Sequence, residues 1–245
     1  MKNYRITVQY DGSRYSGWQK QGNTSNTIQG KIEGVLSKMT GSEIEIHGSG
    51  RTDAGVHALE QVANFKCTTP LSCCEIQNYL NQYLPLDIRI LTLTEAAPRF
   101  HARLNAVKKH YRYVIDSNTI PDVFTRKYRT HFPISYNLSA MEKAASLLSG
   151  EHDFRSFCDN KRMKKSTVRT IESITLTMQD GILTIDYVGN GFLYHMVRIL
   201  TGTLLEIGEE KRKPEEITKI LQAKDRSVAG FTAPPQGLYL VKVYY

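Results

Sequence analysis

Residues 43–65 read EIEIHGSGRTDAGVHALEQVANF, two alternating segments around a glycine-rich middle. Polar and apolar residues alternate from Glu43 to His47 and again from about Gln61 to Phe65, which predicts two half-buried strands. Between them, Gly48–His57 holds three glycines in eight residues and cannot form a regular element. We therefore expect a strand, a loop and a second strand in this order.

A helix is predicted on each side of this strand pair. Before it, Ile28, Ile32, Val35, Leu36 and Met39 recur at helical spacing and form one apolar stripe. After it, Ser72 and Glu75 form a capping box, which predicts a helix that ends near Pro85.

Alternating residues beyond the two helices, at Tyr4–Tyr10 and Asp87–Leu93, predict two outer strands. The first half of the chain thus has the predicted order β-α-β-β-α-β.

The second half of the chain is predicted to have the same element order, although its sequence is not similar to that of the first half. Lys109–Ile115 is strand-like, and Ser139 with Glu142 forms a second capping box, opening a helix that Gly150 ends. Two further strands meet at Asp180-Gly181, a hairpin turn signal. The remaining expected elements are a helical stripe over Phe192–Ile207, a shorter helix from Pro214 and a final strand over Leu238–Tyr244.

The two predicted units each correspond to a split βαβ motif. The sequence therefore predicts an α+β protein made of two ferredoxin-like halves, residues 1–104 and 105–245, with antiparallel sheets flanking a central cleft. The first half carries the glycine-rich loop, and the second half is expected to complete the cleft.

Composition narrows the classes of function. Lys and Arg number 32 against 24 Asp and Glu, and this net charge of +8 favours a polyanionic partner or, alternatively, serves only solubility. No stretch is apolar enough to cross a membrane and no leader is recognisable, so we expect a soluble protein that stays in the cytoplasm. Four cysteines without a C-x-x-C pair predict buried, reduced thiols, and the seven histidines show no metal-binding spacing. We expect no metal site.

Asp53 is the strongest candidate for chemistry, because it lies two residues after Arg51 in the flexible loop. An ordinary Asx turn, in which Asp53 binds its own backbone, is the alternative from local chemistry alone. A phosphate-binding loop is a third interpretation, weakened by the absence of a following Gly-Lys-Ser/Thr.

The string Gly50-Arg51-Thr52-Asp53-Ala54-Gly55-Val56-His57-Ala58 resembles the signature of the tRNA pseudouridine synthase A family. The resemblance covers nearly the whole chain, and its one clear departure is Leu200-Thr201-Gly202, which lies on a predicted helix. The other matching blocks are Tyr10-Asp11-Gly12, Gly17-Trp18-Gln19, Phe100-His101-Ala102-Arg103, Tyr111-Arg112-Tyr113, Gly191-Phe192-Leu193, Met196-Val197-Arg198 and Gly237-Leu238-Tyr239-Leu240.

This resemblance implies a cytoplasmic homodimer that isomerises uridine to pseudouridine at positions 38, 39 and 40 in the anticodon stem-loop of tRNA. It implies an RNA-binding cleft between the halves and no cofactor. Asp53 matches the catalytic nucleophile, and an aspartate suits the breaking of a glycosidic bond. Whether it attacks carbon 1′ of the sugar, attacks carbon 6 of the base, or first removes a ribose proton stays open.

The resemblance also assigns three supporting residues. Arg198 is expected to pair with the Asp53 carboxylate, with a solvated or phosphate-binding arginine as the alternative. Arg51 is expected to hold the space of the flipped nucleotide, and a plain phosphate contact is its alternative. Tyr111 is expected to stack on the target uracil, although either it or Tyr113 is expected to be a core residue.

Two basic runs, Arg126–Arg129 and Lys161–Lys165, are interpreted as phosphate-contacting loops or as merely solvated segments. Basic charge and aromatic residues on strands would also fit a non-catalytic RNA-binding protein on the same scaffold. Arg51-Thr52-Asp53 argues against such a protein, because a pure binder has no use for a carboxylate facing phosphates. A metal-dependent nuclease is disfavoured by the lack of clustered acidic residues.

Overall fold

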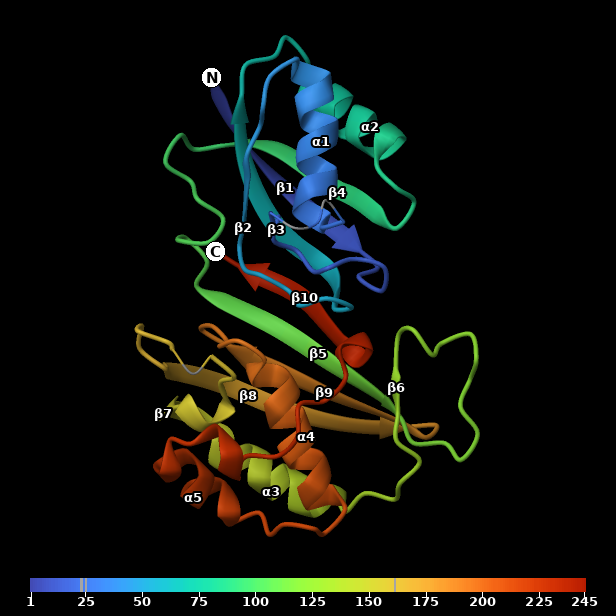
Figure 1. The fold of residues 1–245 in the computed structure, drawn as a ribbon, viewed down its shortest axis with the longest axis vertical. Helices are drawn as coiled ribbons and strands as arrows, with labels where there is room; N and C mark the ends of the chain where they lie inside the picture. The colour runs from blue at the N-terminus through green and yellow to red at the C-terminus, as the bar shows by residue number, and fades with distance from the viewer. Residues whose placement is uncertain (23, 25, 161) are drawn as a thin grey trace. The chain divides into compact units, whose positions relative to one another are not determined.

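The computed structural model describes residues 1–22, 24, 26–160 and 162–245 (Figure 1). The chain divides into two units, each with its own core. The first comprises Met1–Val107 together with Tyr239–Tyr245, and the second comprises Lys108–Leu238.

The first unit is a sheet carrying two helices. Its sheet has the strand order β4-β1-β3-β10, and β2 also pairs with β3; all these pairings are antiparallel except that of β3 with β10. Helices α1 and α2 lie side by side over the sheet (Figure 1). The elements are β1 (Lys2–Tyr10), α1 (Ile28–Thr40), β2 (Ile46–Gly48), β3 (His57–Cys67), α2 (Cys73–Tyr83), β4 (Ile88–Ala96) and β10 (Leu238–Tyr244).

The apolar positions that the sequence pattern predicts in this unit form its core. In β1 the predicted apolar residues are buried, and Ile6 and Val8 are fully inaccessible. In α1 the predicted stripe faces the sheet through Ile28, Ile32 and Leu36. The capping box before α2 is confirmed, because Ser72 and Glu75 each accept the backbone N–H of the other.

The second unit is also a sheet with helices. Its strand order is β5-β9-β8-β7, all antiparallel, and β6 pairs with β5 in parallel. The predicted hairpin turn is confirmed, since Asp180 and Gly181 both have positive φ between β8 and β9. The elements are β5 (Lys108–Asp116), β6 (Thr130–His131), α3 (Leu138–Leu148), β7 (Gly150–Asp153), β8 (Val168–Gln179), β9 (Ile182–Gly189), α4 (Met196–Gly208) and α5 (Glu216–Ala223).

Three expectations about element boundaries were wrong. Asn137, not Ser139, caps α3, because its side chain accepts the N–H of Ala140 at 3.0 Å and Ser139 lies inside the helix. Helix α4 begins at Met196 rather than near Phe192, because the left-handed His195 (φ 60°) cannot belong to a preceding helical turn.

The third concerns the strand expected at Glu43–His47. It forms only as β2 because the N–H groups of Ile44 and Ile46 bond to side chains of α1 instead, those of Ser37 and Glu33 respectively.

The prediction of buried, reduced thiols is confirmed for only some of the cysteines. Among the described residues all four cysteines are reduced; Cys67 and Cys158 are buried, but Cys74 is exposed. Within the described ranges, no helix has the length and apolar character needed to span a membrane.

Glu33 joins α1 to the edge strand β2. The side chain is 5% exposed, and one carboxylate oxygen accepts both the Ile46 N–H at 3.0 Å and the Gln29 side-chain N–H at 2.8 Å. We expect Glu33→Ala to lower the free energy of unfolding by about 1–3 kcal/mol, because both donors lose their acceptor in a buried site. Denaturant unfolding measures this loss.

Glu43 provides the matched control, since its carboxylate is 90% exposed and lies 3.9 Å from the same Lys20 that reaches Glu33. Glu43→Ala should change stability by less than about 0.5 kcal/mol. Equal losses for the two variants would contradict the role given to Glu33.

Candidate active site

The glycine-rich loop leaves β2 at Gly48 and enters β3 at His57, and a buried glutamine fixes its first part. Gln61 is inaccessible to solvent. Its side-chain oxygen accepts the Ser49 hydroxyl at 2.6 Å, and its amide nitrogen donates to the Gly50 carbonyl at 3.0 Å. One side chain thus satisfies two loop residues and holds the chain just before Arg51.

The centre of the loop is anchored at Thr52. Its hydroxyl lies 2.8 Å from the hydroxyl of Tyr10, and its carbonyl accepts the Trp18 N–H at 3.1 Å. Burial raises the pKa of Tyr10 far above its ordinary value, so its hydroxyl stays protonated at neutral pH. Thr52 is therefore fixed on both sides while its neighbours Arg51 and Asp53 point elsewhere along the loop.

Two glycines allow the N-terminal segment to lie directly against this loop. A Cβ added to Gly12 would sit 1.9 Å from the carbonyl oxygen of Val56. Gly17 has a φ of +89°, and a Cβ there would sit 2.6 Å from the carbonyl oxygen of Thr52. No side chain fits at either position, so the loop is held by backbone-to-backbone contact.

His57 closes the loop at the start of β3. The ring is 2% exposed and stacks on Tyr239, with 4.9 Å between ring centroids. Its Nδ1 lies 3.1 Å from the Gly12 N–H and 3.2 Å from a carboxylate oxygen of Asp11. Nδ1 can accept the Gly12 N–H, or it can carry a proton and donate it to Asp11, but it cannot do both at once.

Asp53 lies at the tip of this held loop and is half-buried. The bond that closes its turn runs from the Val56 N–H to the backbone carbonyl of Asp53, at 3.2 Å, and Gly55 supplies a φ of +79°. Arg51, two residues earlier, is exposed and donates from Nε to the side-chain oxygen of Gln19 at 3.1 Å.

Tyr111 and Tyr113 lie on β5 in the second unit. Tyr111 is 8% exposed and meets Phe192 edge to face, with 5.2 Å between ring centroids. Tyr113 is the fully buried core residue, and its hydroxyl lies 2.7 Å from both the Thr130 hydroxyl and the Pro234 carbonyl. Both tyrosines are among the buried core residues, and Tyr113 is the more deeply buried of the two.

Arg198 is in the first turn of α4, and its surroundings fix it. Its Nε donates to the Ala233 carbonyl at 2.7 Å, and its own carbonyl accepts the Ala233 N–H at 3.1 Å. The side chain is half-buried. A freely solvated arginine, one of the alternatives, does not describe this geometry.

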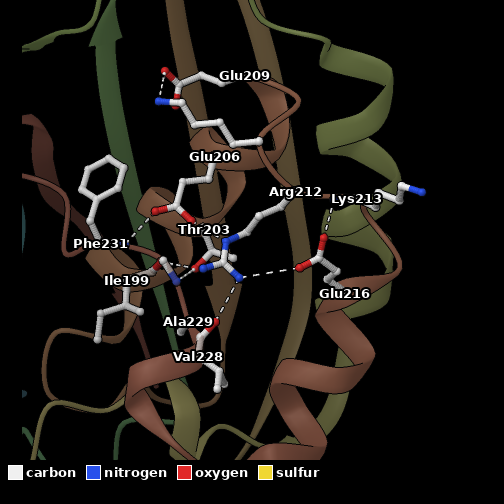
Figure 2. Close-up of polar contacts among 12 residues, drawn as sticks. Ile199, Thr203, Glu206, Glu209, Arg212, Lys213, Glu216, Val228, Ala229 and Phe231 are labelled. Atoms are coloured by element: carbon white, nitrogen blue, oxygen red, sulfur yellow. Dashed lines mark hydrogen bonds and ion pairs between the residues drawn. The ribbon is translucent and has the colours of Figure 1, made fainter.

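Farther along α4, polar contacts hold the segment that leads to Ala233 (Figure 2). Glu206 accepts the Phe231 N–H at 3.2 Å and pairs with Arg212 at 2.5 Å. Arg212 also donates to the Val228 carbonyl at 3.0 Å. Segment 228–233 is thus attached to the helix at several points before it reaches Arg198.

Asp159 fixes the residue just before α4. His195 lies 2.6 Å and Arg226 2.7 Å from its two carboxylate oxygens. Burial raises the pKa of the Asp159 carboxyl, but the hydrogen bonds from His195 and Arg226 outweigh burial and lower its pKa below the ordinary value. Asp159 therefore stays ionised and anchors the start of the helix that carries Arg198.

The structure brings Asp53 and Arg51 together in one loop of the first unit and places Tyr111 and Arg198 in the second. The pairing of Asp53 with Arg198 stays a prediction. Of the two basic runs, Lys161 lies outside the described residues, and Arg126 donates to the Val123 carbonyl in an exposed segment. No cluster suited to a metal ion occurs among the residues that the structure describes.

Sequence reasoning missed the residues that hold the loop. Tyr10, Gly12, Gly17 and Trp18 lie in blocks that matched the family signature, but no local pattern assigned them a role. Gln61 carried no recognisable signal, because its function depends on being buried opposite Ser49 and Gly50.

Comparison with known proteins identifies the family. The family model described as tRNA pseudouridine synthase matches residues 6–105 and 144–245. A tRNA pseudouridine synthase A of Bacillus sp. (strain KSM-64) is 51% identical over 98% of both chains. Proteins of Bacillus anthracis (tRNA pseudouridine synthase A 2) and Clostridium tetani (tRNA pseudouridine synthase A 1) are each 47% identical over the full length of both chains.

Among solved structures, a chain of a Cbf5-Nop10-Gar1 complex is similar over 97% of this chain and 48% of that chain, with 13% identity and a TM-score of 0.37. A likeness this low adds nothing to the assignment, which rests on the full-length relatives. On their identity and coverage, and on the family model, the chain belongs to the tRNA pseudouridine synthase family, whose members are isomerases.

Proposed function

We propose that this tRNA pseudouridine synthase isomerises uridine to pseudouridine at positions 38, 39 and 40 in the anticodon stem-loop of tRNA. The observation that carries the proposal is the Asp53 loop, which holds a carboxylate at its tip by buried contacts from Gln61 and Tyr10. The net charge of +8 suits a polyanionic substrate.

The reaction breaks the bond between N1 of uracil and carbon 1′ of ribose, turns the base and joins its carbon 5 to carbon 1′. A proton leaves carbon 5 and N1 gains one, so atoms and electrons balance within the substrate. Asp53 acts as the nucleophile, which stabilises either the electron-poor sugar or the detached base. No cofactor takes part in this balance.

The other residues bind and position. Arg51 is exposed beside Asp53, where its guanidinium fills the space left by the flipped nucleotide. Tyr111 stacks on the uracil, and its edge-to-face contact with Phe192 would hold the ring for that purpose. Arg198 pairs with Asp53; its Nε is already engaged by Ala233, so the terminal nitrogens would serve the carboxylate.

The proposed function also implies how the chain is divided into halves, how many copies assemble and where the protein acts. We infer two ferredoxin-like halves, residues 1–104 and 105–245, flanking the RNA-binding cleft. The order β-α-β-β-α-β over β1–β4 supports the first half, whereas the final strand β10, which the sequence assigned to the second half, groups with the first unit. We further infer a homodimer that acts in the cytoplasm, where its tRNA substrate is found.

Asp53→Asn tests the chemistry. The change keeps the size and hydrogen-bonding capacity of the side chain but removes its charge, so we expect pseudouridine formation to be abolished and tRNA affinity to stay within a few-fold of the wild type. Mapping pseudouridine in an anticodon stem-loop RNA measures turnover. Appreciable turnover by the verified variant would contradict the role of Asp53, and an inactive wild type would favour a non-catalytic RNA-binding protein.

Gln61→Leu tests whether the loop must be held. We expect the single-turnover rate to fall by about 10- to 100-fold with little change in RNA affinity, because a small displacement of a catalytic group is costly. Gln77→Leu is the matched control, since the Gln77 side chain on α2 likewise bonds to two residues of another segment, donating to the carbonyls of Ile90 and Leu91. A similar fall in rate for both variants would show that only general stability is affected.

Tyr111 is tested against its neighbour on the same strand. Tyr111→Phe keeps the π-face, so folding and RNA binding should be nearly normal, whereas Tyr111→Ala should lose stacking worth on the order of 1–3 kcal/mol. Tyr113→Phe should instead lower stability by about 1 kcal/mol, because it removes the hydrogen bonds of the hydroxyl, and leave the rate of the folded enzyme unchanged.

Thermal melting and single-turnover assays separate these results. If folded Tyr111→Ala enzyme turned over at the wild-type rate, the stacking role would pass to another residue.

A further inference from the structure

A hollow of about 510 Å³ lies in the first unit beside β2 and β3. Two strands and the segment after β4 supply its walls, and the residues that matter for binding are Glu45, His47, Lys66, Arg99 and His101. The motif Phe100-His101-Ala102-Arg103, which the proposed reaction does not use, forms part of this wall.

The strand wall follows from the pairing of β2 with β3. His47 lies opposite Asn64 in the register, and Lys66 follows Asn64 by two residues, so these three share one face of the strand pair. Lys66 is exposed, which leaves its ammonium group accessible to a ligand.

Two buried amides hold the opposite wall in place. Asn64, 2% exposed, accepts the Ala102 N–H at 2.8 Å and donates its side-chain N–H to the side-chain oxygen of Asn3 at 3.2 Å. Asn3, 4% exposed, donates to the carbonyls of Ala97 and Phe100, both at 2.9 Å. The segment that carries Arg99 and His101 is therefore fixed over the strands.

Across the hollow, the rings of His47 and His101 stack with 5.0 Å between centroids. Burial and the nearby His47 both lower the pKa of His101, because the two stacked imidazoles disfavour a shared positive charge. The stacked pair presents an aromatic surface whose His101 ring is disfavoured from carrying a positive charge, and histidine rings are among those on which RNA bases stack.

Charge in the hollow favours an anion. Lys66 and Arg99 give two positive charges against one carboxylate, that of Glu45, so these three side chains have a net charge of +1. The Glu45 side chain is 75% exposed and can remain hydrated. A phosphate would gain charge-assisted hydrogen bonds from the lysine and the arginine.

We propose that this hollow binds a second nucleotide of the tRNA, apart from the modified uridine, with its phosphate on Lys66 and Arg99 and its base stacked on the His47–His101 pair. The inference rests on the proposed function, because it takes the RNA to be the substrate at Asp53. Six residues separate His47 from Asp53, so the two sites are at most roughly 20 Å apart along an extended chain. One stem-loop can reach both.

The first experiment measures the salt dependence of affinity for an anticodon stem-loop RNA, with Asp53→Asn present in every protein so that the RNA is not converted. Lys66→Glu combined with Arg99→Glu should lower affinity at least tenfold and reduce the log–log slope by roughly one, because the phosphate that the two side chains share is no longer neutralised. Lys38→Glu combined with Lys219→Glu is the control, because both lysines are exposed on helices, neither lines the hollow, and the change in net charge is the same. Equal changes for the two pairs would overturn the proposal.

The second experiment tests the stacking surface. His47 is exposed, so its replacement should leave the melting temperature within a few degrees of the wild type. His47→Phe keeps a ring and should keep the affinity, whereas His47→Ala should weaken binding at least about fivefold. If both variants bind the RNA as the wild type does, no base stacks there and the proposal is wrong.

Two further outcomes distinguish this proposal from a site for free nucleotides and from the proposed reaction. If free uridine monophosphate, at the same concentration as the RNA, occupied the hollow as fully as the stem-loop does, the site would bind free nucleotides and the proposal would fail. If the wild type makes no pseudouridine but the Lys66 and Arg99 variant still loses affinity, the hollow stands as an RNA site and only the proposed reaction fails.

Discussion

The close approach of Gly12 and Gly17 to the Asp53 loop is the constraint on which the site depends. A Cβ at Gly12 would sit 1.9 Å from the Val56 carbonyl oxygen, far inside any permitted contact. The N-terminal segment can therefore reach the loop only because these positions lack side chains. Backbone contact of this kind leaves little freedom, and it holds Thr52, which lies between Arg51 and Asp53.

The second unit uses the same kind of contact to hold its own site residue. A Cβ at Gly202 would sit 1.9 Å from the Phe231 carbonyl oxygen, and one at Gly230 would sit 2.7 Å from the Cα of Thr203. Helix α4 and segment 228–233 thus lie backbone against backbone, and Ala233 binds Arg198 at the end of that contact. The departure from the family pattern at Leu200-Thr201-Gly202 keeps the glycine that this contact requires.

Buried polar side chains orient both candidate sites of the first unit. Gln61 satisfies two groups of the Asp53 loop, and Asn64 with Asn3 fixes the segment over the proposed nucleotide hollow. A buried amide is costly unless its donors and acceptors are matched, so each of these residues admits few loop geometries. These matched hydrogen bonds restrict the geometry of both sites, and the exposed side chains of Arg51, Lys66 and Arg99 are those that we propose to contact RNA.

The sequence by itself determined the element order of the first unit, the capping box at Ser72, the hairpin at Asp180-Gly181 and the loop that carries Asp53, because each depends on local periodicity or turn chemistry. Local signals failed where another side chain took the backbone group: Glu33 of α1 binds the Ile46 N–H, and Asn137, two residues before the expected cap Ser139, binds the start of α3. Only the tertiary structure decided that Gln61 holds Gly50 and that Asn64 holds Ala102. These contacts join residues that are 11 and 38 positions apart and exist only once the sheet has formed.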